Sequence, residues 1–386
     1  MNILILGTSN SILKRGYVDG LRSELAADYN IVNLSIGASP GLQFGAFLNK
    51  NLKDFKYVIF DSLPNDEQYS YDTPGYDERL GSGRVLFEIL STISNKSNLI
   101  IMGFCLKHYL YNKTNVYEMR RKMAYKVNAH FIDIAEMLKY YNIADPVLSN
   151  IYEDHTAHPK ASISYGIGKI IGKKIKTNSF KNRSGKSIDY SKNFYVKRIS
   201  DFSDKYKTIH CSNSLTSDNF SEIPSGEIIK FNPAHLVGFY VNASATNCRV
   251  SLKYKEKCIF SMFLNFPLKR KFLKLFVPIP TPSIVDSIII KNLDQLRKED
   301  IKPRMTPDLQ SSNKINKLCL QKVQISEILF WNANQEKVLE EKNVISDYEA
   351  EKVSRDILFD ISKDIFTNVN NNFFKKYILK KFKRII

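Results

Sequence analysis

The stretch that decides the fold is the start of the chain, MNILILGTSNS, residues 1–11. Its four apolar residues, Ile3–Leu6, run directly into the small polar residues Gly7 to Ser11. A short continuous apolar run predicts a strand that is buried on both faces of a sheet. The hydroxyl residues after it have two interpretations: they cap the next helix, or they hold Ser9 at the strand end as a nucleophile.

The rest of the first 180 residues repeats this pattern of short apolar runs separated by helical stretches. Such alternation is typical of a parallel sheet with helices on both faces. Ile163–Ile175 has the pattern of a closing helix, so we expect a flavodoxin-like three-layer α/β/α domain over residues 1–180. The expected strands contain Ile3–Leu6, Ile31–Leu34, Tyr57–Phe60, Leu99–Met102 and Phe131–Ile134, and the expected helices are Ile12–Ala27, Arg84–Ser94 and Tyr117–Val127.

The second half of the chain has a different texture. Residues 181–193 are polar and predict a linker. Runs such as LVGFYVNA and KVQISEILFW then follow at short spacing with little helical periodicity, which predicts a β-sandwich over residues 194–335. Residues 336–386 turn helical and basic, so we expect a helical tail.

The net charge of +18 lies mainly in the second half. Residues 1–180 carry 21 Lys and Arg against 17 Asp and Glu, whereas residues 181–386 carry 36 against 22. Such a field attracts a polyanionic glycan, an anionic lipid surface or nucleic acid, and no nucleic-acid-binding signature favours the last of these. The alternative explanation of the positive charge is a generally lysine-rich composition.

Compartment and cofactor chemistry follow from shorter signals. The sequence has no run of about 18 apolar residues, so no membrane span is predicted. The apolar start is too short for a signal peptide, so we expect a cytoplasmic protein. The five cysteines are widely spaced and form no C-x-x-C pair, which argues against a disulfide framework and against a metal site.

Three further polar features stand at matching places in the predicted domain. Gly37 follows the second strand, where a residue without Cβ lets a substrate oxygen approach a backbone N–H. Asn65 follows the third strand and has an amide to aim at the same oxygen. His158 precedes the closing helix, and Asp154 and His155 lie just before it. Neither G-x-G-x-x-G nor G-x-x-x-x-G-K-[ST] is present, so a phosphate-binding loop is a poor interpretation.

These blocks resemble those of the SGNH (GDSL-type) hydrolase superfamily. The G-D-S-x-S block is matched by Gly7, Ser9 and Ser11, with Thr8 in place of Asp. The glycine block is matched by Gly37, and the G-x-N-D block by Asn65 and Asp66, with Leu63 in place of glycine. In the D-x-x-H block His158 matches, but the position three before it is His155 and the carboxylate is one residue earlier, at Asp154.

The resemblance implies roles for these residues. Ser9 would be the nucleophile and His158 its base, and the Ser9 N–H, the Gly37 N–H and the Asn65 amide would form the oxyanion hole. The group that orients the histidine stays open. It is Asp154 if the turn carries an extra residue, or a backbone carbonyl holds His158, or His155 is itself the base.

Residues around these blocks have simpler interpretations. We expect Asp66 to hold the Asn65 loop rather than to react, and Tyr17 to pack. The run Arg120-Arg121-Lys122 on a predicted helix is most simply a solvated face.

The family includes lipases, carbohydrate esterases and O-acetyltransferases. A cytoplasmic chain with a β-sandwich and a basic tail favours O-acetylation of a capsular or surface polysaccharide, with acetyl-CoA as donor. The alternatives are a carbohydrate esterase and a catalytically inactive glycan-binding protein. Residues 368–386 carry six basic residues and no acid, so the tail either lies on the anionic inner face of the cell membrane or docks on its own domain.

Overall fold

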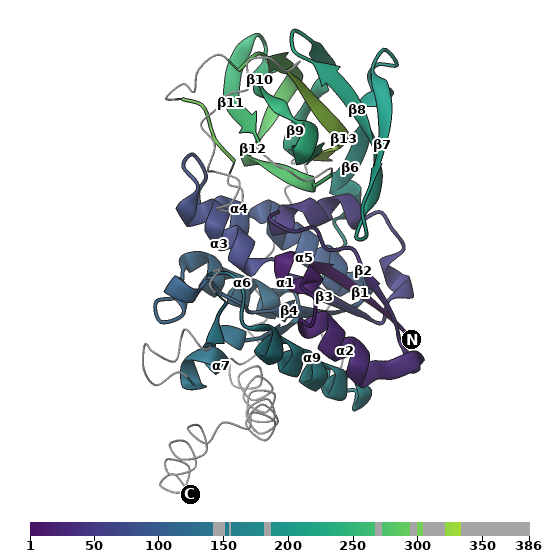
Figure 1. Cartoon of the computed structure of the whole chain (residues 1–386), viewed down its shortest axis with the longest axis vertical. Coiled ribbons are helices and arrows are strands. Elements are labelled where there is room, and N and C mark those ends of the chain that lie inside the picture. The colour runs from purple at the N-terminus through teal and green to yellow at the C-terminus, as the bar shows by residue number, and fades with distance from the viewer. Residues whose placement is uncertain are drawn as a thin grey trace, which may run out of the picture.

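The computed structural model describes residues 1–141, 151–153, 156–180, 187–266, 272–293, 299–303 and 321–332. They form two units stacked on one another, an α/β domain and a β domain (Figure 1). The expected tail 336–386, including 368–386, lies outside the described residues, as do Asp154, His155 and the first part of the expected linker. Within the described ranges, none of the helices is long and apolar enough to cross a membrane.

The α/β domain is built on a five-stranded sheet in the order β2-β1-β3-β4-β5. All its strand pairs are parallel, as predicted. The order reverses between β1 and β3, and this switch point is where open α/β sheets place their ligand crevice, at the carboxyl ends of the strands. The strands are β1 (Asn2–Gly7), β2 (Asn30–Asn33), β3 (Tyr57–Asp61), β4 (Asn98–Met102) and β5 (His130–Ile132).

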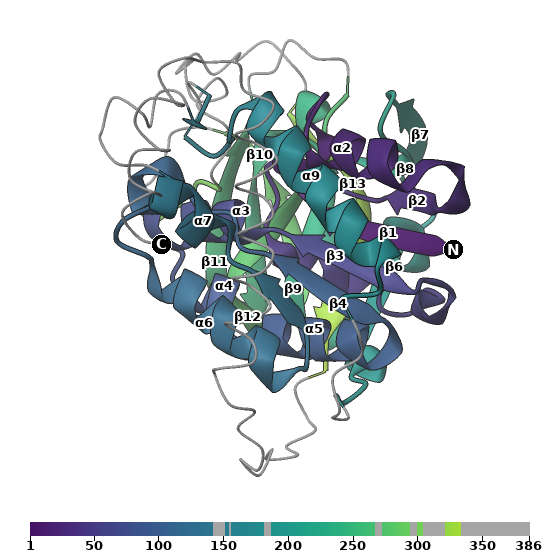
Figure 2. The same ribbon diagram turned by 90° about the horizontal axis from the view of Figure 1, so that it is seen from below.

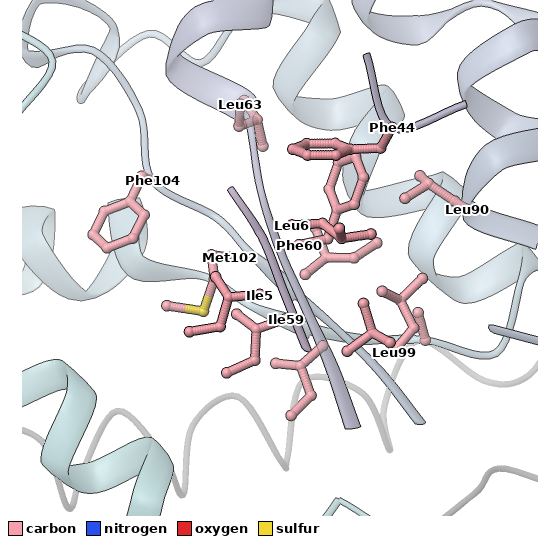
Figure 3. Close-up of a cluster of buried hydrophobic side chains, with 14 of the residues drawn as sticks. Ile5, Leu6, Phe44, Ile59, Phe60, Leu63, Leu90, Leu99, Met102 and Phe104 are labelled. Carbon is pink, nitrogen blue, oxygen red and sulfur yellow. The ribbon is translucent and has the colours of Figure 1, made fainter. Parts of the chain in front are cut away.

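Continuous apolar runs suit these strands because both faces of the sheet are buried. Neighbours along a strand point to opposite faces. Figure 3 shows Ile5 and Ile59 on one face of the strands and Leu6 and Phe60 on the other. Phe44, from a 3₁₀ segment, packs edge-on against Phe60 with ring centroids 5.3 Å apart, which closes the core on that face.

Helices cover both faces of the sheet. On one face, α2 (Tyr17–Leu25) and α9 (Ala161–Lys176) lie side by side (Figures 1 and 2). They approach so closely that a Cβ on Gly168 would lie 1.9 Å from the Tyr17 carbonyl oxygen. The further helices are α1 (Ser9–Ile12), α3 (Leu63–Asp72), α4 (Arg79–Ser82), α5 (Arg84–Lys96), α6 (Asn115–Lys126) and α7 (Ile134–Tyr141). Short 3₁₀ segments are Ala26–Asp28, Gly41–Phe47, Leu52–Asp54, Lys107–Tyr109, Ser191–Asn193, Ile199–Asp201 and Ala243–Ala245.

The β domain is antiparallel, and its described strands form one connected eight-stranded sheet rather than two separate ones. The long strands β9 and β12 carry register shifts. Such irregularities bend a sheet, and here the strands surround a second hydrophobic core. The strands are β6 (Phe194–Arg198), β7 (Lys207–Ser212), β8 (Ser217–Pro224), β9 (Ile228–Asn242), β10 (Asn247–Tyr254), β11 (Lys257–Asn265), β12 (Lys274–Lys291) and β13 (Lys322–Trp331).

The two domains share buried surface. Tyr240 and Phe276 of the β domain belong to the core cluster of the α/β domain. The Tyr240 hydroxyl donates to the Gln43 carbonyl at 2.6 Å, and the Tyr76 hydroxyl donates to the Pro278 carbonyl at 2.8 Å. Buried hydrogen bonds between apolar surfaces fix the relative position of the two elements that they join. The β domain is therefore packed onto the loops at one end of the α/β domain.

Candidate active site

Ser9 is the most exposed residue of the turn that follows β1. Thr8, Asn10 and Ser11 are buried, with at most 1% of their surface exposed, whereas Ser9 is half-buried. Gly7 is needed because a Cβ there would lie 1.8 Å from the Ser11 hydroxyl. Thr8 is the N-cap residue of α1, but its side chain makes no capping hydrogen bond. The other polar residues of this turn are therefore buried, whereas Ser9 lies toward the surface.

Ser11 ties the turn to the neighbouring strand. Its hydroxyl donates to Asp61 Oδ2 at 2.7 Å and lies 2.6 Å from the Tyr17 hydroxyl. Asp61 is the last residue of β3, so this bond joins the ends of the two strands at the switch point. Burial raises the pKa of Asp61 to about 7, and the Ser11 hydrogen bond opposes part of that rise.

His158 reaches the same turn from 148 residues away. Its Nδ1 lies 2.9 Å from Asn10 Oδ1, and Asn10 Nδ2 donates to the Ala157 carbonyl at 3.2 Å. Sequence reasoning missed Asn10, although it stands next to Ser9 in the first block. Asp154 and His155, the candidates for the orienting group and for an alternative base, lie outside the described residues.

Backbone hydrogen bonds hold in place the segment that carries His158, described over residues 151–153 and 156–160 and called here the histidine loop. The Glu153 N–H donates to the His158 carbonyl at 2.9 Å, and the Lys160 N–H donates to the Ile151 carbonyl at 2.7 Å. The Lys107 N–H donates to the Thr156 carbonyl at 2.8 Å, which attaches the loop after β4 to the histidine loop. His158 itself is half-buried.

Gly37 lies close to Ser9. A Cβ built on Gly37 would lie 4.0 Å from both Cα and Cβ of Ser9. The Ile36 N–H donates to the Gly7 carbonyl at 3.1 Å, which fixes the loop of residues 34–41 (the glycine loop) beside the turn of residues 7–11 that carries Ser9. Gly37 is therefore placed where its peptide flanks the serine.

Asn65 sits in the first turn of α3 and is 4% exposed. The next residue, Asp66, joins this turn to the glycine loop because the Gly41 N–H donates to Asp66 Oδ1 at 2.7 Å. Ser62 Oγ and Arg120 Nη2 both donate to Asp66 Oδ2 at 2.6 Å. Asp66 thus has the structural role that the sequence predicted.

The prediction that Arg120 lies on a solvated face is wrong. Arg120 is fully buried, paired with Asp66, and also donates to the Gly81 carbonyl at 3.1 Å. Its neighbour Arg121 is partly exposed and pairs with Glu118 at 3.0 Å. Successive helical residues point about 100° apart, so adjacent arginines occupy different environments.

The β domain contacts the glycine loop through Ser39. The Phe276 N–H, on β12, donates to Ser39 Oγ at 3.0 Å, and Ser39 Oγ donates to the Gly37 carbonyl at 3.2 Å. Ala38, between them, has a positive φ of 55° and packs against the β-domain core. A strand of the second domain therefore holds the loop that carries Gly37, which sequence reasoning did not anticipate.

The described residues thus bring Ser9, Gly37 and the Asn10–His158 pair to one edge of the sheet, and Asp66 and Gly41 tie the Asn65 turn to it. A half-buried serine close to a glycine, with a histidine bonded to the next residue of the same turn, brings together the residue types that acyl transfer uses. Among the described residues, we find no cluster of His, Cys, Asp or Glu side chains that would hold a metal ion.

No protein-family model matches the chain, and no curated protein matches it. Among solved structures, it is similar to a two-domain esterase active on acetylated mannans, co-crystallised with mannopentaose. That match has a TM-score of 0.49 and 11% identity, and covers 87% of this chain and 92% of the esterase. A member of the lipolytic protein G-D-S-L family from Veillonella parvula has a TM-score of 0.35 and 16% identity, over 46% of this chain and 98% of that one. The structure is similar to a protein of the G-D-S-L family, whose blocks the sequence resembles.

Proposed function

We propose that this protein is a serine esterase that removes acyl groups from carbohydrate, with Ser9 as nucleophile and His158 as base. One observation carries the proposal: His158 Nδ1 bonds to Asn10, the residue directly after Ser9, on a turn that also contacts Gly37. Nucleophile, base and oxyanion loop therefore converge from three segments that are far apart in the sequence.

In this mechanism, the Ser9 hydroxyl oxygen attacks the acyl carbon of the ester. His158 Nε2 takes the hydroxyl proton as the C–O bond forms, and the carbonyl electron pair moves onto its oxygen. The Ser9 N–H, the Gly37 N–H and the Asn65 amide donate to that oxyanion. When the intermediate collapses, the ester C–O bond breaks and the imidazolium returns its proton to the sugar oxygen. Water then attacks the acyl-serine by the same route and releases the acid.

The substrate class rests on the resemblance in the sequence blocks. Hydrolysis needs only water as acceptor, so we place it ahead of the O-acetyl transfer from acetyl-CoA that the sequence analysis favoured. The transfer stays a prediction. The similar two-domain esterase is active on acetylated mannans, and an acetylated mannan is therefore our first polymeric test substrate.

The test compares the wild-type chain with Ser9→Ala on an aryl acetate and on acetylated mannan. We expect Ser9→Ala to lower kcat by about 10³-fold or more on both substrates. Ser23→Ala, at an exposed serine of α2, is the matched control and should keep wild-type rates. Serine-independent hydrolysis would overturn the proposal, and Ser9-dependent acetylation of a polymer by acetyl-CoA without hydrolysis would favour the transferase.

A further inference from the structure

The side-chain amide of Asn10 is the feature of the site to which no role has been assigned. It is 1% exposed and makes two hydrogen bonds to consecutive residues of the histidine loop. Oδ1 lies 2.9 Å from His158 Nδ1, and Nδ2 lies 3.2 Å from the Ala157 carbonyl oxygen. A buried amide with both ends engaged is held in one orientation.

The Ala157 carbonyl determines which way round the amide lies. A backbone carbonyl oxygen can only accept, so it requires the NH₂ end of Asn10. The opposite orientation would place two acceptor oxygens against one another. Asn10 Oδ1 must therefore face the imidazole.

The amide in turn determines the proton on His158. An amide oxygen can only accept, so the ring nitrogen that faces it must carry a hydrogen. A neutral imidazole with a proton on Nδ1 has its lone pair on Nε2, and this is the tautomer in which Nε2 can take a serine proton.

We propose that Asn10 is a positioning residue that holds His158 in the Nδ1–H tautomer and orients its ring toward Ser9. The inference rests on the proposed function above. It gives a neutral amide, placed one residue after the nucleophile, a positioning role of the kind that the sequence block expects from a carboxylate before the histidine. The nucleophile and the group that orients its base then belong to a single turn.

The geometry also explains why this residue is an asparagine. Aspartate at this position would accept from Nδ1 but would have no donor for the Ala157 carbonyl, and leucine or alanine would lose both bonds. Asn10 joins the turn after β1 to the loop before α9 through both ends of one side chain.

The test uses the full chain with Asn10→Ala and Asn10→Asp. We expect Asn10→Ala to lower kcat for the aryl acetate by about 10²-fold, with KM within about threefold, because the base is misoriented rather than the substrate released. Asn10→Asp keeps an acceptor oxygen for the His158 Nδ1–H, so we expect kcat to stay within about tenfold of wild type. Asn242→Ala, which removes a buried amide of the β domain that bonds Gln324 at 2.8 Å, should leave kcat unchanged.

A spectroscopic readout separates this role from a structural one. In protein labelled with ¹⁵N-histidine, the shifts of the two ring nitrogens report the tautomer, and the spectrum of His158→Gln identifies the His158 signals. We expect Nδ1–H in wild type and in Asn10→Asp, and a shift toward Nε2–H or a mixture in Asn10→Ala.

Each outcome decides the proposal. A folded Asn10→Ala with wild-type kcat and tautomer would overturn it, as would an Asp154→Asn variant that alone reproduces both losses. If Asn10→Ala does not fold, Asn10→Asp carries the test, and loss of the Nδ1–H tautomer there overturns the inference. If Ser9→Ala stays active, the proposed function fails, while the tautomer measurement still judges Asn10.

Discussion

Each domain contains a fully buried arginine–aspartate pair, and the two pairs hold different things in place. In the α/β domain, Arg120 Nη2 lies 2.6 Å from Asp66 Oδ2. In the β domain, Arg249 Nη2 lies 2.9 Å from Asp300 Oδ2. Each aspartate also accepts a serine hydroxyl at 2.6 Å, so the two clusters are chemically alike.

The difference lies in what the two aspartates join. Asp66 follows Asn65 and also accepts from the Gly41 N–H, so it connects the first turn of α3 to the end of the glycine loop. Asp300 connects β10 to Ser261 on β11. A buried pair is costly to break because the remaining charge is left uncompensated. The same interaction should therefore support stability in both domains but catalysis in only one.

The largest effect is expected from Arg120→Met. The substitution leaves Asp66 buried without its cation, so we expect the free energy of unfolding to fall by about 3–5 kcal/mol. The turn that carries Asn65 also loses its anchor, and we expect kcat/KM for the aryl acetate to fall by about 10²-fold in the folded protein. Urea unfolding and steady-state kinetics measure the two quantities. A destabilised variant with wild-type kcat/KM would contradict the role that we assign to this pair.

Arg249→Met is the matched variant in the β domain. Since its aspartate is equally buried, we expect a similar loss of about 3–5 kcal/mol in unfolding free energy. The kcat/KM of the folded fraction should stay within about twofold of wild type, because distant sites act independently. If Arg249→Met lowers kcat/KM as strongly as Arg120→Met, the two pairs do not differ in the way proposed.

Asp61 gives a third case, a buried carboxyl that accepts from a hydroxyl instead of an arginine. Its pKa is raised to about 7, so the folded state holds a proton that the unfolded state releases near pH 4. Stability from this group is therefore greatest below pH 4 and declines as the pH rises to about 7. Asp61→Asn removes this ionisation. Between pH 5 and pH 8, the unfolding free energy of wild type should therefore fall by about 2 kcal/mol more than that of the variant. Urea unfolding at both pH values checks this, and equal losses would refute it.

Ser39→Ala should have the smallest effect. It removes the acceptor of the Phe276 N–H and the donor to the Gly37 carbonyl, while the ion pairs remain. We expect a loss of about 1–2 kcal/mol in stability and a fall in kcat of about 5- to 30-fold, with KM little changed. Ser251→Ala, at a buried serine of β10, is the control for kcat. An unchanged kcat in Ser39→Ala would mean that β12 does not support catalysis.

Much of the α/β fold could be predicted because its signal is local. Strands buried on both faces need continuous apolar runs, and β1 to β5 lie where such runs occur. Helix ends were harder to place. The expected helix Ile12–Ala27 is divided, because Leu13 is extended, Arg15 has a positive φ of 58°, and α2 begins after Gly16. The apolar periodicity of residues 12–27 continues across this break, so periodicity alone did not reveal it.

Arg120 shows why burial of a charged residue was not predictable. A run of three basic residues on a helix has the composition of a solvated face, and Arg121 follows that expectation in part. Arg120 departs from it only because Asp66, 54 residues earlier, lies within reach in the fold. The sequence around Arg120 does not show that Asp66 lies next to it in the fold.

By itself, the sequence determined the parallel sheet, and it predicted that Ser9, Gly37 and Asn65 follow successive strands at one edge, because the carboxyl ends of parallel strands share that edge. Tertiary structure alone decided which polar residue of the first turn faces the histidine and which element supports the glycine loop. Asn10 meets His158 across 148 residues, and Phe276 meets Ser39 across 237. Such hydrogen bonds depend on the relative positions of packed elements, and a local run of residues does not specify those positions.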